Sequence, residues 1–441
     1  MWQQTRSRVI KTNLNKASKE LKALLIELEN MKVSKYLESL SPSEASNYSL
    51  WKATKVIHQQ TNHCSSIKMP DGNWAKTDED KAQTFASYLK NVFTPFPRDL
   101  SISLAEEETI TNSLNTSITT SSPPHLPITH NEVVKVIQGL KVSKSPGYDL
   151  ITAKILKELP PVGIKFLTYI FNAVLRLNHF PLQWKVAQVI LILKHGKSPQ
   201  NTSSYRPISL LPMISKVLEI IILNRLMPII NENQLIPDHQ FGFRKNHSTI
   251  EQCNRVYQAA REAIEKKEFC TAVFLDISQA FDKVWHQGLL FKLKEMFPLN
   301  IWKILHSYIT NRHFMVKTGS CESDLCCIES GVPQGSVLGP VLYTLYTSDL
   351  PLSSSTYTGT YADDTVIISS NRNKHIATRN VQNNLNEIQT WLAKWRIKAN
   401  ESKSVQITFT LKKDTCPAIT LNSTTLPQVN EVKYLGIHFD Q

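Results

Sequence analysis

The amino-acid sequence predicts an α+β fold for most of the chain, preceded by a helical N-terminal region. Apolar residues recur at helical spacing in some segments and as short β-type runs in others. These segments follow one another without the strict βαβ order of a parallel sheet, which favours the α+β class. The hydrophobic content of 41% supports a substantial core, and the length is typical of about three domains.

The first part of the chain predicts helices followed by a linker. Leucines recur at helical spacing among Lys and Glu in residues 13–40, a pattern that suits either a docking helix or a linker helix. Residues 48–95 predict a second, small helical region. Residues 111–127 are rich in Thr, Ser, Asn and Pro, as flexible linkers are. We therefore expect a helical N-terminal region at 1–110, a linker at 111–127 and a mixed domain at 128–441.

The mixed domain predicts helices and strands in irregular alternation. A helix is expected at 132–140, and strands at 186–193 and 206–210 flank a basic turn. Ser248 and Glu251 have the spacing of a capping box, which opens the next helix. We expect this helix to extend to about residue 267, followed by a strand at 269–277 and helical segments to about 310. A turn at 331–335, a helix to about 350 and a β-hairpin around 361–364 come next. The chain then continues with a helix at 378–396 and strands at 404–410 and 432–439.

The charge balance indicates a polyanionic partner. The chain has 50 Lys and Arg against 37 Asp and Glu, a net charge of +13, which favours nucleic acid or an acidic membrane surface. A membrane is disfavoured because the most apolar stretch, residues 217–230, contains charged residues and is shorter than the roughly 20 residues of a span. Seven irregularly spaced cysteines predict free thiols in a reducing compartment. No secretory signal is visible, so we expect an intracellular protein, in the cytoplasm or the nucleus, without a membrane span.

Three carboxylates define the candidate catalytic site. Asp363 and Asp364 lie at the tip of a predicted β-hairpin, and Asp276 ends an apolar strand. Adjacent carboxylates repel and a charge at the end of an apolar strand is costly, so a nearby cation would relieve both problems. Oxygen ligands suit Mg²⁺, with the backbone carbonyl of Ile277 as a further candidate ligand. Two such ions, for which Mn²⁺ is the expected substitute, would activate an attacking 3′-hydroxyl and stabilise a leaving pyrophosphate. The alternative is an acidic surface patch.

Two further segments contain candidate nucleotide contacts. Lys194 and Arg206 lie on adjoining strands and would grip a triphosphate, the Arg in a bidentate manner. Gln334 and Gly335 belong to a turn that opens a helix, where backbone approaches a ligand closely and phosphate is favoured. Taken alone, the first segment also suits a solvated charged turn, and the second an ordinary Pro-Gly turn.

Other candidate residues are aromatic or basic. Phe281 follows Asp276 by five positions, and its ring would lie beneath an incoming sugar and exclude a 2′-hydroxyl. Phe243 and Arg244 combine a ring with a cation, which suits single-stranded nucleic acid. Lys403 would donate a proton to the leaving pyrophosphate. Taken alone, Phe281 is more typical of a core aromatic, and the segment of Phe243 and Arg244 is as typical of a loop packed on the core. Lys403 by itself is one lysine of many.

Taken in order, these segments resemble a reverse transcriptase of the non-LTR retrotransposon type, specifically the jockey group. The match extends over residues 144–437. Val273-Phe274-Leu275-Asp276 with Ala280-Phe281-Asp282 resembles the first palm motif, Gly331-Val332-Pro333-Gln334-Gly335-Ser336 the second, Tyr361-Ala362-Asp363-Asp364 the third, Asn400-Glu401-Ser402-Lys403 the fourth, and Lys433-Tyr434-Leu435-Gly436-Ile437 the primer grip.

The resemblance implies the right-hand polymerase fold and a defined reaction. Fingers are expected at about 128–268 and a palm at about 269–441, with Mg²⁺-dependent synthesis of DNA from dNTPs on an RNA template and a DNA primer. It also implies that nucleic acid contacts Tyr361, Tyr434, Leu435 and Gly436 in addition to Phe243 and Arg244. Because no endonuclease precedes residue 1 and the chain ends soon after the primer grip, we expect a largely missing thumb and target nicking by another protein.

Two alternatives remain open at this point. An RNA-dependent RNA polymerase shares the palm, but Phe281 disfavours the ribonucleotides that it would use. A catalytically inactive remnant that only binds RNA is the second alternative, because the thumb is expected to be missing. All three candidate metal carboxylates are present in the sequence, which favours catalysis over that remnant.

Overall fold

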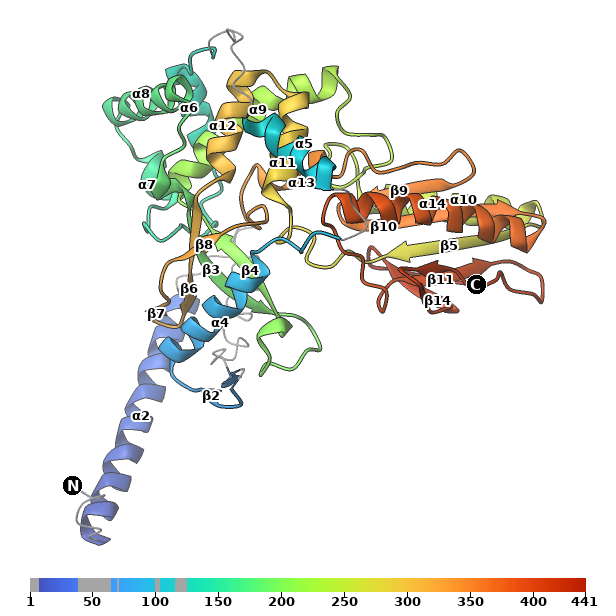
Figure 1. Cartoon of the computed structure of the whole chain (residues 1–441). Coiled ribbons are helices and arrows are strands. Elements are labelled where there is room, and N and C mark those ends of the chain that lie inside the picture. Colours follow the sequence, from blue (N-terminus) through green and yellow to red (C-terminus); the bar gives the residue numbers. More distant parts are fainter. Residues whose placement is uncertain (1–7, 39–64, 70, 100–103, 116–124) are drawn as a thin grey trace. The chain divides into compact units, whose positions relative to one another are not determined.

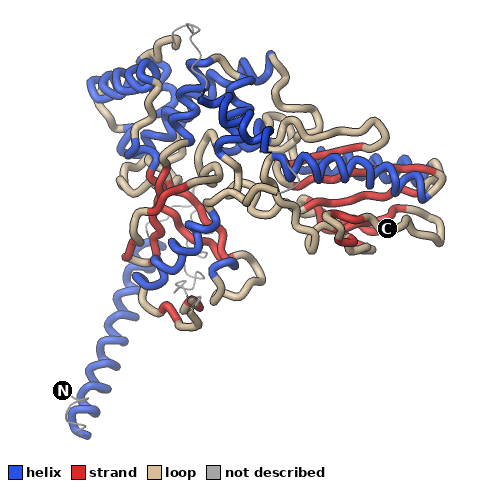
Figure 2. Tube along the Cα trace, viewed as in Figure 1, coloured by secondary structure: helices blue, strands red, loops and turns tan. Residues whose placement is uncertain are grey.

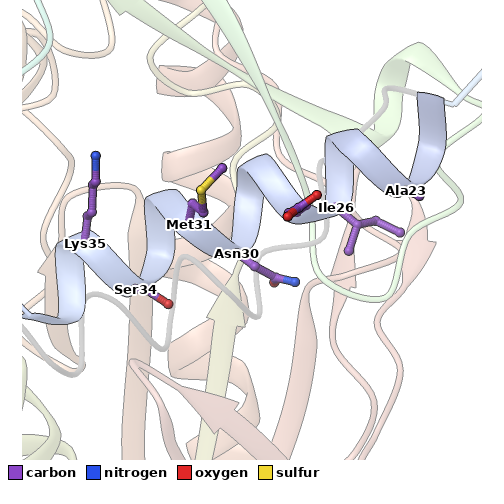
Figure 3. A pocket seen from close by; sticks show the side chains of 7 residues that line it. Ala23, Ile26, Asn30, Met31, Ser34 and Lys35 are labelled. Atoms are coloured by element: carbon purple, nitrogen blue, oxygen red, sulfur yellow. The ribbon is translucent and has the colours of Figure 1, made fainter. Parts of the chain in front are cut away.

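The structure is a computed structural model that describes residues 8–38, 65–69, 71–99, 104–115 and 125–441. The chain divides into two compact units, residues 1–64 and 65–441. In the first unit the described part is one helix, α2 (Arg8–Glu38), which confirms the helix expected from residue 13 as far as residue 38. Side chains that include Ala23, Ile26, Asn30 and Met31 line a hollow along one face of this helix (Figure 3). Residues 48–64 of the second expected helical region lie outside the described residues.

The second unit begins with a small hairpin and two helices. Strands β1 (Ile67–Lys68) and β2 (Trp74–Ala75) precede α4 (Asp78–Val92) and α5 (Leu104–Asn115). Thr77 caps α4 by accepting a hydrogen bond from the Asp80 backbone N–H. The hairpin was not expected, and α5 continues into the first residues of the expected linker, of which 116–124 lie outside the described residues. The division of the chain at 110 and 127 therefore stays a prediction.

A helical group follows in the sequence. It comprises α6 (His130–Gly139), α7 (Ala153–Lys157), α8 (Pro161–Leu177), a 3-10 turn at Leu182–Lys185 and α9 (Met213–Glu232). Thr129 and Glu132 form a capping box at the start of α6, which confirms the helix expected there. These helices share one large hydrophobic core with four later helices, α11 (His286–Met296), α12 (Leu299–Ile309), α13 (Gly339–Tyr346) and α14 (Lys374–Lys394). Within the described ranges, no helix combines the length and apolarity needed to cross a bilayer.

A five-stranded mixed sheet holds the basic turn. It contains β3 (Val186–Leu193), β4 (Tyr205–Leu210), β6 (Arg312–Thr318), β7 (Cys321–Glu322) and β8 (Cys326–Ile328). A 3-10 turn at Thr202–Ser204 leads into β4. β3 runs antiparallel to β4, as the sequence predicts, but it pairs in parallel with β6. The strands β6, β7 and β8 were not expected, because Arg and Lys interrupt the apolar pattern of β6 and its parallel partner is distant in the sequence.

A four-stranded antiparallel sheet has the order β11-β5-β10-β9. Its strands are β5 (Phe269–Leu275), β9 (Tyr357–Tyr361), β10 (Asp364–Asn371) and β11 (Val405–Phe409). Alternate residues of β5 belong to two different clusters, so Ala272 packs toward α10 (Thr249–Glu265) and Val273 toward α14 (Lys374–Lys394). A strand buried on both faces reads as a continuous apolar run, which explains why it was visible in the sequence. Figure 1 shows α14 alongside β10 and β5.

The remaining elements complete the second unit. They are α11 (His286–Met296), α12 (Leu299–Ile309), α13 (Gly339–Tyr346), β12 (Thr420–Leu421), β13 (Thr424–Thr425), β14 (Glu431–Tyr434) and β15 (Ile437–Asp440). The single strand expected at 432–439 is wrong: Leu435 and Gly436 both have positive φ and form a two-residue hairpin turn between β14 and β15. The mixture of helices with two larger sheets is visible in Figure 2 and agrees with the predicted α+β class.

Candidate active site

The four-stranded sheet brings the three predicted carboxylates together at one end of its strands β5 and β10. Strands β5 and β10 are antiparallel neighbours, with Leu275 opposite Thr365. Asp276 follows the last residue of β5, and Asp364 is the first residue of β10, so the two positions lie at the same end of this strand pair. Residues far apart in the sequence therefore meet because two apolar strands pair in one register.

The turn that carries Asp363 has an unusual backbone. Tyr361 pairs with Asp364 and closes the β9–β10 hairpin. Between them, Ala362 has a φ of 58°, in the left-handed region. For a residue with a Cβ atom this conformation costs about 1–2 kcal/mol, so contacts from outside the hairpin must stabilise the turn.

The carboxylates influence one another electrostatically. Burial raises the pKa of Asp363, and repulsion from Asp276 raises it further, while Arg206 acts in the opposite direction. Asp364 is an exposed residue, yet desolvation by the surrounding protein, together with repulsion from Asp363 and Asp276, raises the pKa of its carboxyl to about 6. A bound cation would remove this repulsion, and carboxylate oxygens are ligands that Mg²⁺ prefers.

The geometry is not that of a closed metal site. Across the part of the chain that the structure describes, no group of three or more His, Cys, Asp or Glu side chains is placed to hold a metal ion. Instead, Asp276 Oδ2 lies 3.3 Å from the Nζ atom of Lys403. The backbone around Ile277 pairs with the segment before Lys403, where Asn400 N–H donates to the Asp276 carbonyl at 2.7 Å. The residues thus have the right donor chemistry for Mg²⁺ and lie close enough to repel one another.

Three basic side chains gather beside these carboxylates. Burial lowers the pKa of Lys194, and the charges of Lys403 and Arg206 lower it further, so the three cations lie within electrostatic range of one another. Lys194 follows β3 and Arg206 lies on β4, opposite Ile192. Adjacent cations and carboxylates are the arrangement that a magnesium–triphosphate complex requires.

Hydrogen bonds join the turn at 331–336 to Asp282 and to strand β4. Gln334 Nε2 donates to Asp282 Oδ1 at 2.8 Å, and the Gln334 carbonyl accepts from Ser209 N–H on β4 at 2.8 Å. Gly335 has a φ of 120°, and a Cβ atom there would lie 2.5 Å from the Ser209 carbonyl oxygen. Only glycine fits this close approach, so the turn is fixed against the strand that carries Arg206.

The predicted aromatic residues form a short stack. The ring of Phe281 lies against Tyr343 with centroids 4.4 Å apart, and Phe243 meets it edge-on at 5.8 Å. Phe243 is 50% exposed, whereas Arg244 uses its Nη1 atom for the Pro237 carbonyl at 3.1 Å. Phe243 is therefore the more accessible member of the pair that we expected to contact nucleic acid.

The predicted primer-grip residues separate into a buried and an exposed part. Tyr434 is buried against Phe274, and its hydroxyl accepts a hydrogen bond from Gln252 Nε2 at 3.2 Å. In the turn that follows, Leu435 is half-buried against the core and Gly436 is exposed. The Tyr434 ring is thus not available for stacking on a base in this structure. Tyr361 lies half-buried beside the carboxylate turn.

The structure also reveals three residues that the sequence analysis did not assign to the site. Asp282 contacts Gln334, Gln240 contacts the carboxylate turn at Ala362, and Glu219 accepts a hydrogen bond from the Val337 N–H at 2.7 Å. Glu219 had a detectable signal, because a charge within an apolar helix needs a partner. Asp282 belongs to the segment that resembles the first palm motif, whereas Gln240 had no signal, since a buried amide cannot be distinguished in the sequence from an exposed one.

Comparison with known proteins gives a consistent set of similarities. Residues 192–439 match the family described as reverse transcriptase (RNA-dependent DNA polymerase). The chain is 40% identical over 437 residues to the probable RNA-directed DNA polymerase from transposon BS of Drosophila melanogaster, covering 97% of this chain and 48% of that protein. It is 38% identical over 428 residues to the RNA-directed DNA polymerase from mobile element jockey of the same organism, covering 95% and 46% of the two chains.

A third relative extends the comparison to the whole chain. The probable RNA-directed DNA polymerase from transposon X-element of Drosophila melanogaster is 37% identical over 445 residues, covering 100% of this chain and 49% of that protein. The chain therefore spans about half the length of the curated relatives it matches.

Proposed function

Because this chain belongs to the reverse transcriptase family, in the jockey group of non-LTR retrotransposon elements, we propose that it is an RNA-directed DNA polymerase. It transfers a nucleotide from a dNTP to a primer 3′-hydroxyl on an RNA template. The observation that supports this most directly is the meeting of Asp276 with Asp363 and Asp364 at one sheet edge, beside Lys194 and Arg206.

The carboxylates of Asp276, Asp363 and Asp364, with the carbonyl of Ile277, are the residues that would hold two Mg²⁺ ions. Their mutual repulsion and their hard oxygen atoms support this assignment. When bound, the ions would activate the 3′-hydroxyl and stabilise the pyrophosphate, and Mn²⁺ is the expected substitute. Lys403, already paired with Asp276, is the candidate proton donor to the leaving group.

The nucleotide would be bound by residues from three segments. Lys194 and Arg206 bind the triphosphate, and Gln334 with Gly335 contacts the nucleotide from the turn that precedes α13. Phe281 lies beneath the sugar and excludes a ribose 2′-hydroxyl. The stacking of Phe281 on Tyr343 supports this role, because a ring held in place acts as a firm steric barrier.

The template and primer would lie along the exposed part of the same edge. Phe243 and Arg244 are the proposed template contacts, and Tyr361, Leu435 and Gly436 face the primer, with Tyr434 supporting that turn from inside the core. In this assignment residues from about 128 to 268 are the fingers, and those from about 269 are the palm. The net charge of +13 favours binding of either nucleic acid.

Deoxynucleotide incorporation tests the proposal. The purified chain is supplied with a primed RNA template, dNTPs and Mg²⁺, beside the double variant Asp363→Asn, Asp364→Asn. We expect primer extension by the unaltered chain and a loss of at least about 10³-fold in the variant, because the metal ligands are gone. Asp414→Asn, which changes an exposed carboxylate paired with Lys374, is the matched control and should leave extension unchanged.

The same samples distinguish a polymerase from an inactive protein that only binds RNA. RNA binding is measured at low and high salt for the unaltered chain and the double variant. Salt-sensitive binding without extension in either protein would overturn the proposal in favour of an RNA-binding protein without catalysis. Extension that survives in the double variant would show that other residues carry the reaction.

A further inference from the structure

A short segment runs beside the carboxylate turn from a distant part of the chain. The Phe241 N–H donates to the Thr360 carbonyl at 2.8 Å, and the Thr360 N–H donates to the His239 carbonyl at 2.9 Å. Gln240 and Thr360 form a parallel bridge. The segment therefore extends the sheet beyond β9, next to the residues that precede Asp363.

Within this segment the Gln240 side chain reaches the turn itself. Its Oε1 atom accepts hydrogen bonds from the Ala362 N–H at 2.9 Å and from the Gly242 N–H at 2.7 Å. Its Nε2 atom lies 3.3 Å from the Ala362 carbonyl and donates to it. The carboxamide therefore pairs with both the N–H and the carbonyl of Ala362. Gln240 as a whole is only 3% exposed.

The turn is packed unevenly on its two sides. A cavity of about 30 Å³ lies against it, lined by Gln240, Ala362 and Asp363 among others. On the other side the segment approaches so closely that a Cβ atom on Gly242 would lie 2.2 Å from the Ala362 nitrogen. Ala362 adopts a left-handed backbone conformation, which must be held by its surroundings, and the Gln240 side chain hydrogen-bonds to both its N–H and its carbonyl.

We propose that Gln240 is a positioning residue for the metal-binding carboxylates: its carboxamide fixes the Ala362 peptide and so sets the direction in which Asp363 and Asp364 leave the turn. This inference rests on the proposed function, in which those carboxylates bind metal. Ligands are oriented by the groups behind them, and losing such a group weakens metal binding without removing any ligand.

The chain offers a matched control for this role. Gln406 on β11 is also fully buried and also uses both ends of its carboxamide. Its Oε1 accepts from the Ile419 N–H at 3.0 Å, and its Nε2 donates to the Pro417 carbonyl at 2.9 Å. It has no hydrogen bond to the carboxylate turn, so its loss should affect stability but not metal binding.

The experiment compares Gln240→Met with Gln406→Met in the full chain. Methionine keeps the length of the side chain and removes the donor and the acceptor. Mg²⁺ is titrated in the incorporation assay, and binding of Mn²⁺ to the protein alone is followed by electron paramagnetic resonance. We expect Gln240→Met to weaken both by about 10- to 100-fold and Gln406→Met to leave both unchanged, although each variant unfolds at lower temperature.

A second measurement follows the turn directly. Hydrogen exchange in the peptide that contains residues 361–364 should become faster in Gln240→Met and stay unchanged in Gln406→Met, because only the first variant frees the Ala362 N–H. If Gln240→Met does not fold, Gln240→Asn takes its place, since it keeps a buried amide but is one methylene too short to reach Ala362.

The outcomes distinguish this inference from the proposed function. If the unaltered chain binds Mn²⁺ but does not extend a primer, the proposed function fails while the Gln240 inference is still decided by the binding data. Mg²⁺ and Mn²⁺ dependences in the Gln240 variant that equal those of the unaltered chain would overturn the inference. An equal shift in Gln406→Met would also overturn it, because the effect would then be one of general stability.

Discussion

Phe281 is held from two sides, and this defines what its replacement should do. Tyr343 lies parallel to the ring at 4.4 Å, with an interplanar angle of 23°, and Phe243 meets it at 86°. A ring fixed in this way cannot easily turn aside when a 2′-hydroxyl approaches. Selectivity for deoxynucleotides would therefore depend on the size of this one side chain.

Replacing Phe281 with Val should admit ribonucleotides. We expect the preference for dNTPs over rNTPs, measured as the ratio of kcat/KM values, to fall by about 10- to 100-fold. The matched control is Phe291→Val, which shortens another half-buried ring that contacts Trp395 rather than the site. If Phe281→Val prefers dNTPs over rNTPs as strongly as the control variant does, the steric explanation is wrong.

Asp282 is a second residue whose surroundings lead to a measurable effect. Burial raises the pKa of its carboxyl to about 7, although the Gln334 hydrogen bond and the charges of Lys194 and Lys283 act in the opposite direction. Tyr88 also faces Asp282, and the negative charge contributes to raising the pKa of that phenol. The folded state therefore binds the Asp282 proton more tightly than the unfolded state does, in which the pKa is near the ordinary value of 3.8.

The sign of the pH effect follows from this difference. Between pH 4 and about 7 the folded state holds more protons at this position, so the free energy of unfolding decreases as the pH rises through that window. Asp282→Asn removes the titration and keeps an acceptor for Gln334. We expect the variant to gain stability relative to the unaltered chain as the pH rises to about 7, with no further gain above it, measured by urea unfolding at several pH values. A constant difference between the two proteins at all pH values would contradict the assignment.

At the scale of elements, α9 and α13 are joined by one buried carboxylate. Glu219 is 0% exposed and accepts hydrogen bonds from the N–H groups of Val337 and Leu338, at 2.7 and 3.2 Å, at the start of α13. The hydroxyls of Ser215 and Tyr308 also donate to it. A negative charge at a helix N-terminus is favourable, and here it also anchors the turn that carries Gln334.

Removing that carboxylate should be costly. We expect Glu219→Ala to lower the free energy of unfolding by about 3 kcal/mol, because two buried N–H groups and two hydroxyls lose their acceptor. Urea unfolding measures the change. Glu232→Ala, at the exposed end of the same helix, is the control and should change the stability by less than about 0.5 kcal/mol. Similar losses in the two variants would show that Glu219 contributes only helix propensity.

At the scale of the whole molecule, the second unit includes segments that precede the expected mixed domain. α4 packs against β6, and Lys283 Nζ donates to the carbonyls of Asn91 and Thr94 at 2.8 and 2.6 Å. An ion pair joins Glu107 on α5 to Arg396 after α14. The compact unit thus begins at residue 65, and its early helices contact elements that surround the candidate site.

Much of the local structure could be predicted because it depends on neighbouring residues. The run of apolar residues in β5, the capping box at Ser248 and the hairpin that ends in Asp363 and Asp364 all appear in the structure close to their predicted bounds. Their patterns reflect burial on one or both faces, which the order of side chains records directly. The family also followed from the order of these segments, and the comparisons bear it out.

The contacts between distant segments were decided only by the tertiary structure. Pairing of β3 with β6, burial of Tyr434 and the hydrogen bonds from Gln240 to Ala362 each join residues separated by more than a hundred positions. No local pattern records such contacts, because the same glutamine or tyrosine is equally compatible with a surface position. The sequence by itself determined strand β5, the hairpin with its two carboxylates and the family, whereas packing decided which side chains hold those carboxylates in place.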